Sequence, residues 1–287
     1  MAVQKNYALL ESFLSDITGN FESRVFVEDF VGNAHKATKD INDWVNEQTR
    51  GKIPKLFDED LDPSTIMVLL NAIYFKGTWK YQFEAKKTTK ATFHSASSQA
   101  SEVQMMKLKG TLNYGHFSDD SKLVELPYQN DTLAMYVYLP AEQAKFSAIS
   151  NSFSADHFEA KLGGLHKTSS VEVHLPRFKF EAKYQLAKTL QALGMHDIFV
   201  PGLADLRKMD GKPQKHLFLS EVIHKTYIEV NEEGSEAAAV TGGTIRSNSI
   251  PHPADPKPEF IADRPFAFFI REKATGVTLF AGVINKP

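Results

Sequence analysis

Hydrophobic side chains recur at two spacings along this chain, and each spacing predicts a different kind of element. From Tyr7 to Ile17 apolar residues return every three or four positions, which predicts a helix that Gly19-Asn20 ends. The same spacing predicts a second helix from Asn33 to Thr49. A dense apolar run from Thr65 to Phe75 predicts a central strand buried on both faces.

The middle of the chain is rich in shorter alternating segments, which predict strands. They include Val103 to Leu108, Leu112 to His116 and Leu217 to Val230. The turn Gln129-Asn130-Asp131 separates two further apolar runs and predicts a hairpin. Helices and strands therefore occur together, without an internal repeat or a domain linker.

Two single residues within these elements have a simple structural interpretation. Asn71 interrupts the apolar run and, if buried, must be hydrogen-bonded, most simply to neighbouring backbone. Trp79 follows Gly77 and would most simply be a core aromatic.

The stretch from Glu232 to Thr241, here called the hinge stretch, allows two interpretations. Ser235 could cap a short helix built on Glu236 and three alanines, although so short a helix is marginal in water. Alternatively, at a period of two, one face consists of small residues only, as expected of a segment that enters a sheet without overpacking it. These small residues are Ser235, Ala237, Ala239 and Thr241.

Composition narrows the function classes. The 287 residues are 42% hydrophobic and 24% charged, with a formal net charge of −2 and no cysteine, so disulfides and thiolate chemistry are excluded. This balance favours neither nucleic acid nor membrane as a partner, and no metal-ligand spacing stands out among the histidines. Sequence signatures of hydrolases, nucleotide-binding loops and zinc proteases are absent, so we expect no enzyme activity, cofactor or metal.

Several motifs together resemble one family, the serpins. The hinge stretch resembles the hinge of the reactive-centre loop of inhibitory serpins, and His224-Lys225 resembles the strand that approaches it. Asn71 to Trp79 resembles the family's most distinctive internal motif. Arg264 to Arg271 and Leu279 to Pro287 resemble its final strand pair and C-terminus. The resemblance covers nearly the whole chain.

The resemblance implies a single α+β domain over residues 1–287, with large mixed and antiparallel β-sheets, surrounding helices and an exposed reactive-centre loop at 232–259. It assigns Asn71 and His224 to the shutter, where strands of the main sheet part, and Trp79 to the breach, where the hinge first enters. It also implies that the helix from Asn33 to Thr49 lies across the main sheet. The hinge residues are Glu232, Glu233, Gly234, Ser235, Glu236, Ala237, Ala238, Ala239, Val240 and Thr241.

The function that the resemblance implies is inhibition of a serine protease by a suicide mechanism. The protease attacks a bond in the loop and forms a covalent acyl complex, and the cut loop enters the main sheet before water can hydrolyse the acyl bond. Family spacing favours Asn248-Ser249 as that bond, whereas the chemistry of a trypsin-like pocket favours Arg246-Ser247. The alternatives are a carrier or interaction protein, or a chain that is cleaved as a plain substrate.

The resemblance also shows where this sequence departs from the family pattern. Met1 aligns near the end of the second strand of the main sheet, so we expect an N-terminally truncated serpin that lacks the family's N-terminal helices. Any signal peptide would have been lost with them. We expect a monomer that acts extracellularly, with a cytoplasmic placement as the alternative.

Overall fold

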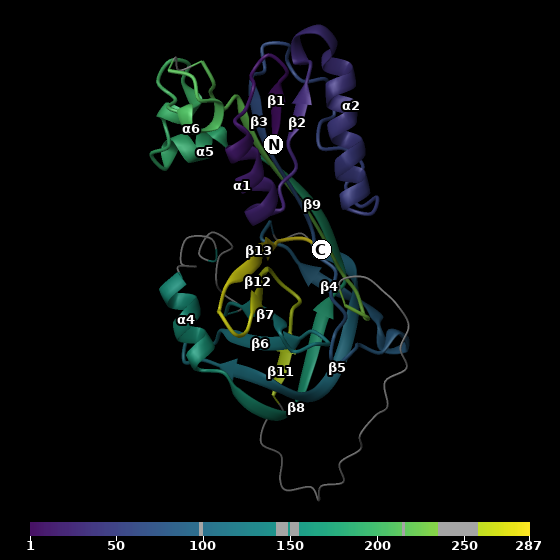
Figure 1. Ribbon diagram of the computed structural model, residues 1–287. Coiled ribbons are helices and arrows are strands. Elements are labelled where there is room, and N and C mark those ends of the chain that lie inside the picture. The colour runs from purple at the N-terminus through teal and green to yellow at the C-terminus, as the bar shows by residue number, and fades with distance from the viewer. Residues whose placement is uncertain (98–99, 142–148, 150–154, 214–215, 235–257) are drawn as a thin grey trace, which may run out of the picture. The chain divides into compact units, whose positions relative to one another are not determined.

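The computed structural model describes residues 1–97, 100–141, 149, 155–213, 216–234 and 258–287. They form two compact units (Figure 1). The first consists of Met1–Tyr74 and Phe180–Ile228, and the second of Phe75–Lys179 and Glu229–Pro287.

The first unit is built on a five-stranded sheet with the strand order β2-β1-β3-β10-β9. Strands β3 and β10 lie side by side and run parallel, with Val68 to Tyr74 paired to Glu221 to Tyr227. The elements are β1 (Ala2–Gln4), α1 (Glu11–Phe21), β2 (Phe26–Glu28), α2 (Phe30–Gln48), β3 (Met67–Tyr74), β9 (Phe178–Gln185), α5 (Ala187–Ala192), η2 (Asp197–Phe199), α6 (Arg207–Asp210) and β10 (Glu221–Val230). The first two residues of β9 and the last two of β10 belong to the second unit.

The second unit is built on an eight-stranded sheet with the order β11-β8-β5-β6-β7-β12-β13, in which β4 also pairs with β5. Most neighbouring strands are antiparallel, but β11 is parallel to β8. The elements are η1 (Ala85–Lys87), β4 (Thr89–His94), β5 (Ala100–His116), β6 (Lys122–Pro127), β7 (Leu133–Leu139), α4 (Ala155–Gly163), β8 (His166–Pro176), β11 (Glu259–Ile261), β12 (Phe266–Glu272) and β13 (Thr278–Ile284). Mixed sheets with flanking helices make this an α+β fold, as expected.

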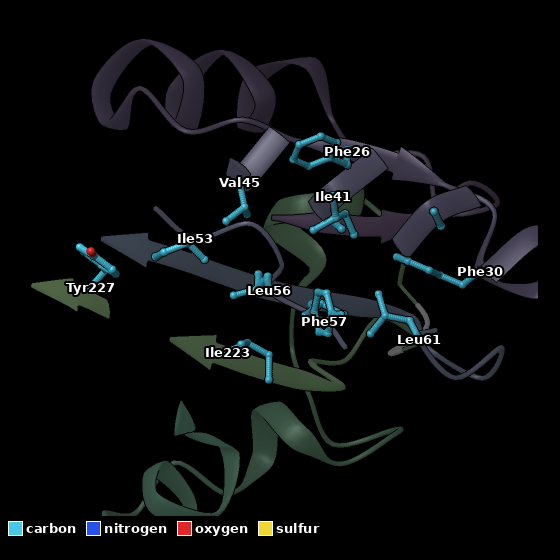
Figure 2. Packing of buried hydrophobic residues seen from close by; sticks show 13 residues of the cluster. Phe26, Phe30, Ile41, Val45, Ile53, Leu56, Phe57, Leu61, Ile223 and Tyr227 are labelled. Atoms are coloured by element: carbon cyan, nitrogen blue, oxygen red, sulfur yellow. The ribbon is translucent and has the colours of Figure 1, made fainter. Parts of the chain in front are cut away.

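Helix α2 covers one face of the five-stranded sheet through its apolar stripe (Figure 2). Phe30, Ile41 and Val45 are fully buried, and the segment after the helix adds a second buried set to the same cluster. The Asp29 carboxylate accepts a hydrogen bond from the Gly32 N–H and caps the helix. The helix expected over Asn33 to Thr49 is therefore confirmed, although it begins at Phe30. The second buried set is Ile53, Leu56, Phe57 and Leu61.

Two elements begin or end at residues other than those predicted from the sequence. Helix α1 begins at Glu11 rather than Tyr7, because Tyr7 and Leu9 pack into a core cluster and the Leu10 N–H binds the Met209 carbonyl. It continues through Gly19 and ends where Glu22 adopts a left-handed φ of 49°. The two strands expected between Val103 and His116 form the single strand β5, which changes register against β8 between Gly110 and Leu112.

The prediction that Thr65 to Phe75 forms a central strand is confirmed by β3, but burial on both faces is wrong. Leu69 is 45% exposed and Asn71 is exposed as well. Among the described residues, α2 covers one face of β3, and the cluster on the other face reaches only Met67. The predicted hairpin at Gln129-Asn130-Asp131 is confirmed by the antiparallel pair β6–β7.

Candidate functional site

Glu232, the first residue of the hinge stretch, is held in the second unit by an ion pair in which only the Glu232 side chain is buried. Its carboxylate is 7% exposed and accepts three hydrogen bonds of 2.7–2.9 Å from the Arg177 guanidinium. The Thr88 hydroxyl donates a further hydrogen bond. Burial alone would raise the pKa of Glu232, but the hydrogen bonds from Arg177 and Thr88 outweigh it and hold the pKa below its ordinary value.

Trp79 holds the backbone on both sides of Glu232. Its indole Nε1–H donates to the Asn231 carbonyl at 2.9 Å, and its backbone N–H donates to the Glu233 carbonyl at 2.9 Å. The ring is 3% exposed and stacks on Tyr128 with a centroid separation of 4.6 Å. The core-aromatic interpretation of Trp79 is therefore correct, and the same side chain touches the start of the hinge stretch.

Gly234 occupies a position that only glycine fits. Its φ of 141° is one that other residues rarely adopt, and a Cβ atom would lie 2.0 Å from the Gly77 carbonyl oxygen. Gly234 forms an isolated antiparallel bridge with Thr78, and its carbonyl accepts from the Asn231 N–H at 2.9 Å. The chain therefore makes a tight, close-packed turn at Gly234.

The 235–257 segment ends at a second fixed point in the same unit. The Pro258 carbonyl accepts a hydrogen bond of 2.9 Å from the Glu172 N–H, and β11 follows in parallel register with β8. Phe260 within β11 is fully buried. Both ends of the segment are therefore held, at Glu232 to Gly234 and at β11.

Most of the predicted hinge and the whole predicted reactive bond lie outside the described residues. This applies to the hinge residues Ser235, Glu236, Ala237, Ala238, Ala239, Val240 and Thr241, and to the bond residues Arg246, Ser247, Asn248 and Ser249. Of the hinge stretch, the structure describes Glu232, Glu233 and Gly234.

Asn71 and His224 are direct partners in the first unit. They face each other in the register of the parallel strands β3 and β10. Asn71 is exposed, so the expectation that it is buried within the strand is wrong. The His224 ring stacks on Tyr184 with a centroid separation of 6.2 Å, and partial burial lowers its pKa. The two residues lie at the seam between β3 and β10.

Sequence reasoning missed Arg177 and Thr88, which hold Glu232. Arg177 lies 55 positions before Glu232, and nothing in either local pattern links the two residues. Within the described ranges, no group of three or more His, Cys, Asp or Glu side chains could hold a metal ion. None of the helices in those ranges has both the length and the apolar character needed to span a bilayer.

The structure is thus an α+β fold with two mixed sheets. Comparison with known proteins identifies its family. The sequence matches the family model described as Serpin (serine protease inhibitor) over residues 1–287. The chain therefore belongs to the serpin family.

Individual relatives agree with this assignment. Serpin B11 of Homo sapiens is 38% identical over 286 residues, which cover 99% of this chain and 71% of that protein. Intracellular coagulation inhibitor 2 of Tachypleus tridentatus is 38% identical over 285 residues, 99% of this chain and 68% of the relative. Among solved structures, uncleaved ovalbumin superposes with a TM-score of 0.86 at 29% identity and covers 100% of this chain and 72% of its own.

Proposed function

We propose that this chain inhibits a serine protease as a suicide substrate. The 235–257 segment offers a bond to the protease, whose serine attacks it and forms an acyl-enzyme. The cut segment then enters the five-stranded sheet between β3 and β10 and carries the acylated protease with it. The observation that carries the proposal is the run of small residues, Ser235 to Thr241, that directly follows the fixed turn at Gly234. The name of the Tachypleus relative, a coagulation inhibitor, supports the same activity.

The energetics of insertion favour this mechanism. Parting β3 from β10 breaks a ladder of seven paired positions, and an inserted strand forms a ladder on each side. About ten additional bonds, at roughly 0.5–1.5 kcal/mol net each, would supply on the order of 10 kcal/mol. A protease whose catalytic groups are displaced by about 1 Å can lose roughly a hundredfold in rate, which slows hydrolysis of the acyl bond.

The identity of the protease follows from the bond that is cut. Arg246-Ser247 suits a trypsin-like pocket with an acidic residue at its base, whereas Asn248-Ser249 gives a longer insertable arm. We favour Arg246 on chemical grounds. Extracellular action remains our prediction, and the word intracellular in the name of the Tachypleus relative supports the cytoplasmic alternative.

Three single substitutions in the segment test the insertion mechanism. Ala239→Pro removes a backbone donor from the inserting stretch, so we expect cleavage by trypsin without a covalent complex on denaturing gels. Ser235→Arg places a bulky charge on the small-residue face and should act in the same way. Ala254→Pro is the matched control, because it lies among prolines beyond the inserting stretch, and it should leave the complex intact. An unchanged amount of complex with Ala239→Pro would rule out insertion.

A further inference from the structure

The turn between β6 and β7 contains a short acceptor pattern that protease inhibition does not use. Of the asparagines in the sequence, Asn130 alone is followed two positions later by a serine or threonine, here Thr132. An asparagine in this pattern, with any residue except proline in the middle, is the acceptor for N-linked glycans. Because so short a pattern also arises by chance, its location in the fold decides whether a glycan can be carried there.

The turn presents Asn130 at the surface. All four residues from Gln129 to Thr132 are exposed. Asp131 has a left-handed φ of 56°, and its N–H donates to the Tyr128 carbonyl at 2.9 Å, which closes the turn. A bulky sugar chain attached at the tip of the hairpin would therefore project into solvent without displacing a strand.

Contacts on both sides of Asn130 fix the backbone of the turn. The Asp131 carboxylate pairs with the Lys80 ammonium at 2.8 Å and with the Lys273 ammonium at 3.0 Å. The Gln129 N–H donates to the Thr78 carbonyl at 2.8 Å. None of these bonds involves the Asn130 side chain, so the position from which a glycan would leave the surface is set independently of the glycan.

A hollow with a volume of about 320 Å³ lies beside Asn130. Gly77, Thr78 and Leu133 contribute to its lining. Gly77 is bare backbone here because a Cβ atom would lie 2.6 Å from the Tyr128 ring. The volume is at the lower end of the roughly 300–1,000 Å³ typical of small-ligand sites, as expected for a single sugar ring. An N-acetylglucosamine has C–H groups to set against Leu133 and polar groups to set against the Thr78 hydroxyl.

We propose that Asn130 carries an N-linked glycan and that its first sugar, an N-acetylglucosamine, occupies this hollow. The transfer joins Asn130 Nδ2 to C1 of the sugar at the reducing end of a lipid-diphosphate-linked oligosaccharide. The bond from C1 to the diphosphate oxygen breaks, the lipid diphosphate leaves with the electron pair of that bond, and the amide gives up one proton. The proposal does not depend on protease inhibition. It requires passage through the secretory pathway, as the predicted extracellular action does.

Translation of the full chain behind a secretion signal, in the presence of endoplasmic-reticulum microsomes, tests the acceptor and requires no folding. We expect a slower-migrating band that is protected from added protease and that an endoglycosidase converts to the unmodified size. Asn130→Gln and Thr132→Ala should each abolish this band, whereas Thr132→Ser retains an acceptor pattern and should preserve it. Asn20→Gln alters an asparagine outside the pattern and is the matched control, which should leave the band unchanged. A protease-protected chain without the shift would overturn the proposal.

Hydrogen exchange then tests the position of the first sugar. The glycoprotein made in secretory cells, trimmed by an endoglycosidase to a single N-acetylglucosamine, is compared with Asn130→Gln made in the same way. A sugar in the hollow shields the turn, so exchange of the Gln129 and Asp131 amides should slow at least about threefold. Equal protection of the Phe268 amide in β12 shows that both samples are folded. Equal exchange at the turn in the two folded samples would mean that the sugar points into solvent, and would overturn its assignment to the hollow.

Discussion

Replacing Arg177 with methionine would leave the Glu232 carboxylate buried without its cation. Hydrogen bonds to a charged group contribute roughly 1.5–3 kcal/mol, and removing one partner of a buried ion pair costs roughly 3–5 kcal/mol. Since the Arg177 side chain is 46% exposed, water replaces part of what is lost. We therefore expect Arg177→Met to lower the free energy of unfolding by about 2 kcal/mol. For a chain of this size, that corresponds to a fall in Tm of roughly 4–8 °C.

The effect of Arg177→Met should depend on pH in a defined direction. In the folded protein the pKa of Glu232 lies below its ordinary value of 4.5, so the pair stabilises the fold fully above pH 4.5. This contribution is lost as the pH falls through the depressed pKa, because Glu232 then becomes protonated in the parent as well. The difference in stability between parent and variant should therefore be full at pH 7 and shrink at acid pH.

Chemical denaturation at pH 7 and at acid pH measures this difference. Lys90→Met is the matched control, since it removes a lysine from a 2.6 Å pair with Glu102 in which both side chains are more than 60% exposed. An exposed pair of this kind contributes less than about 0.5 kcal/mol. If Arg177→Met were as mild as this control, or its effect did not diminish in acid, the buried pair would not stabilise the hinge.

Three further predictions concern other contacts of the second unit. Trp79→Phe removes the indole donor to the Asn231 carbonyl and should cost roughly 1–3 kcal/mol in urea denaturation; a variant as stable as the parent would contradict this. The pair between Asp119 and Lys161 lowers the pKa of Asp119 to about 2, outweighing the opposing effect of burial, so its stabilisation should be complete above about pH 4 and lost towards pH 2. Asp119→Asn should flatten that part of the stability–pH curve, and an unaltered curve would speak against the pair. Gly234→Ala places a Cβ atom 2.0 Å from a carbonyl oxygen, so hydrogen exchange should show a loosened turn, and parent-like protection would refute the clash.

The sequence predicted those parts of the fold that depend on residues close together in the chain. The apolar stripe of α2 and the turn between β6 and β7 depend on residues that are neighbours in sequence, and both elements formed as expected. The start of α1 was not predictable, because Tyr7 and Leu9 satisfy their apolar character in a core cluster and leave the helix to begin after Leu10. A helical spacing alone does not show whether a side chain packs from a helix or from an extended segment.

The candidate site was predictable only in part for the same reason. Glu232 and Gly234 are recognisable from their motif, and Gly234 has the backbone conformation that requires glycine. The partner Arg177 is not recognisable, because a contact across 55 residues depends on the completed sheet. Asn71 appeared buried because its neighbours are apolar, yet burial depends on what covers β3, and the described residues cover one face at that position.

The most direct test of the central claim is to mix the purified chain with trypsin and to examine the products on a denaturing gel. With Arg246 as the attacked residue, the suicide mechanism predicts a covalent band near the summed mass of protease and chain, with release of a C-terminal peptide that begins at Ser247. Complete cleavage of the 235–257 segment with no covalent band would contradict it, because the chain would then be a substrate whose cut segment does not enter the sheet in time.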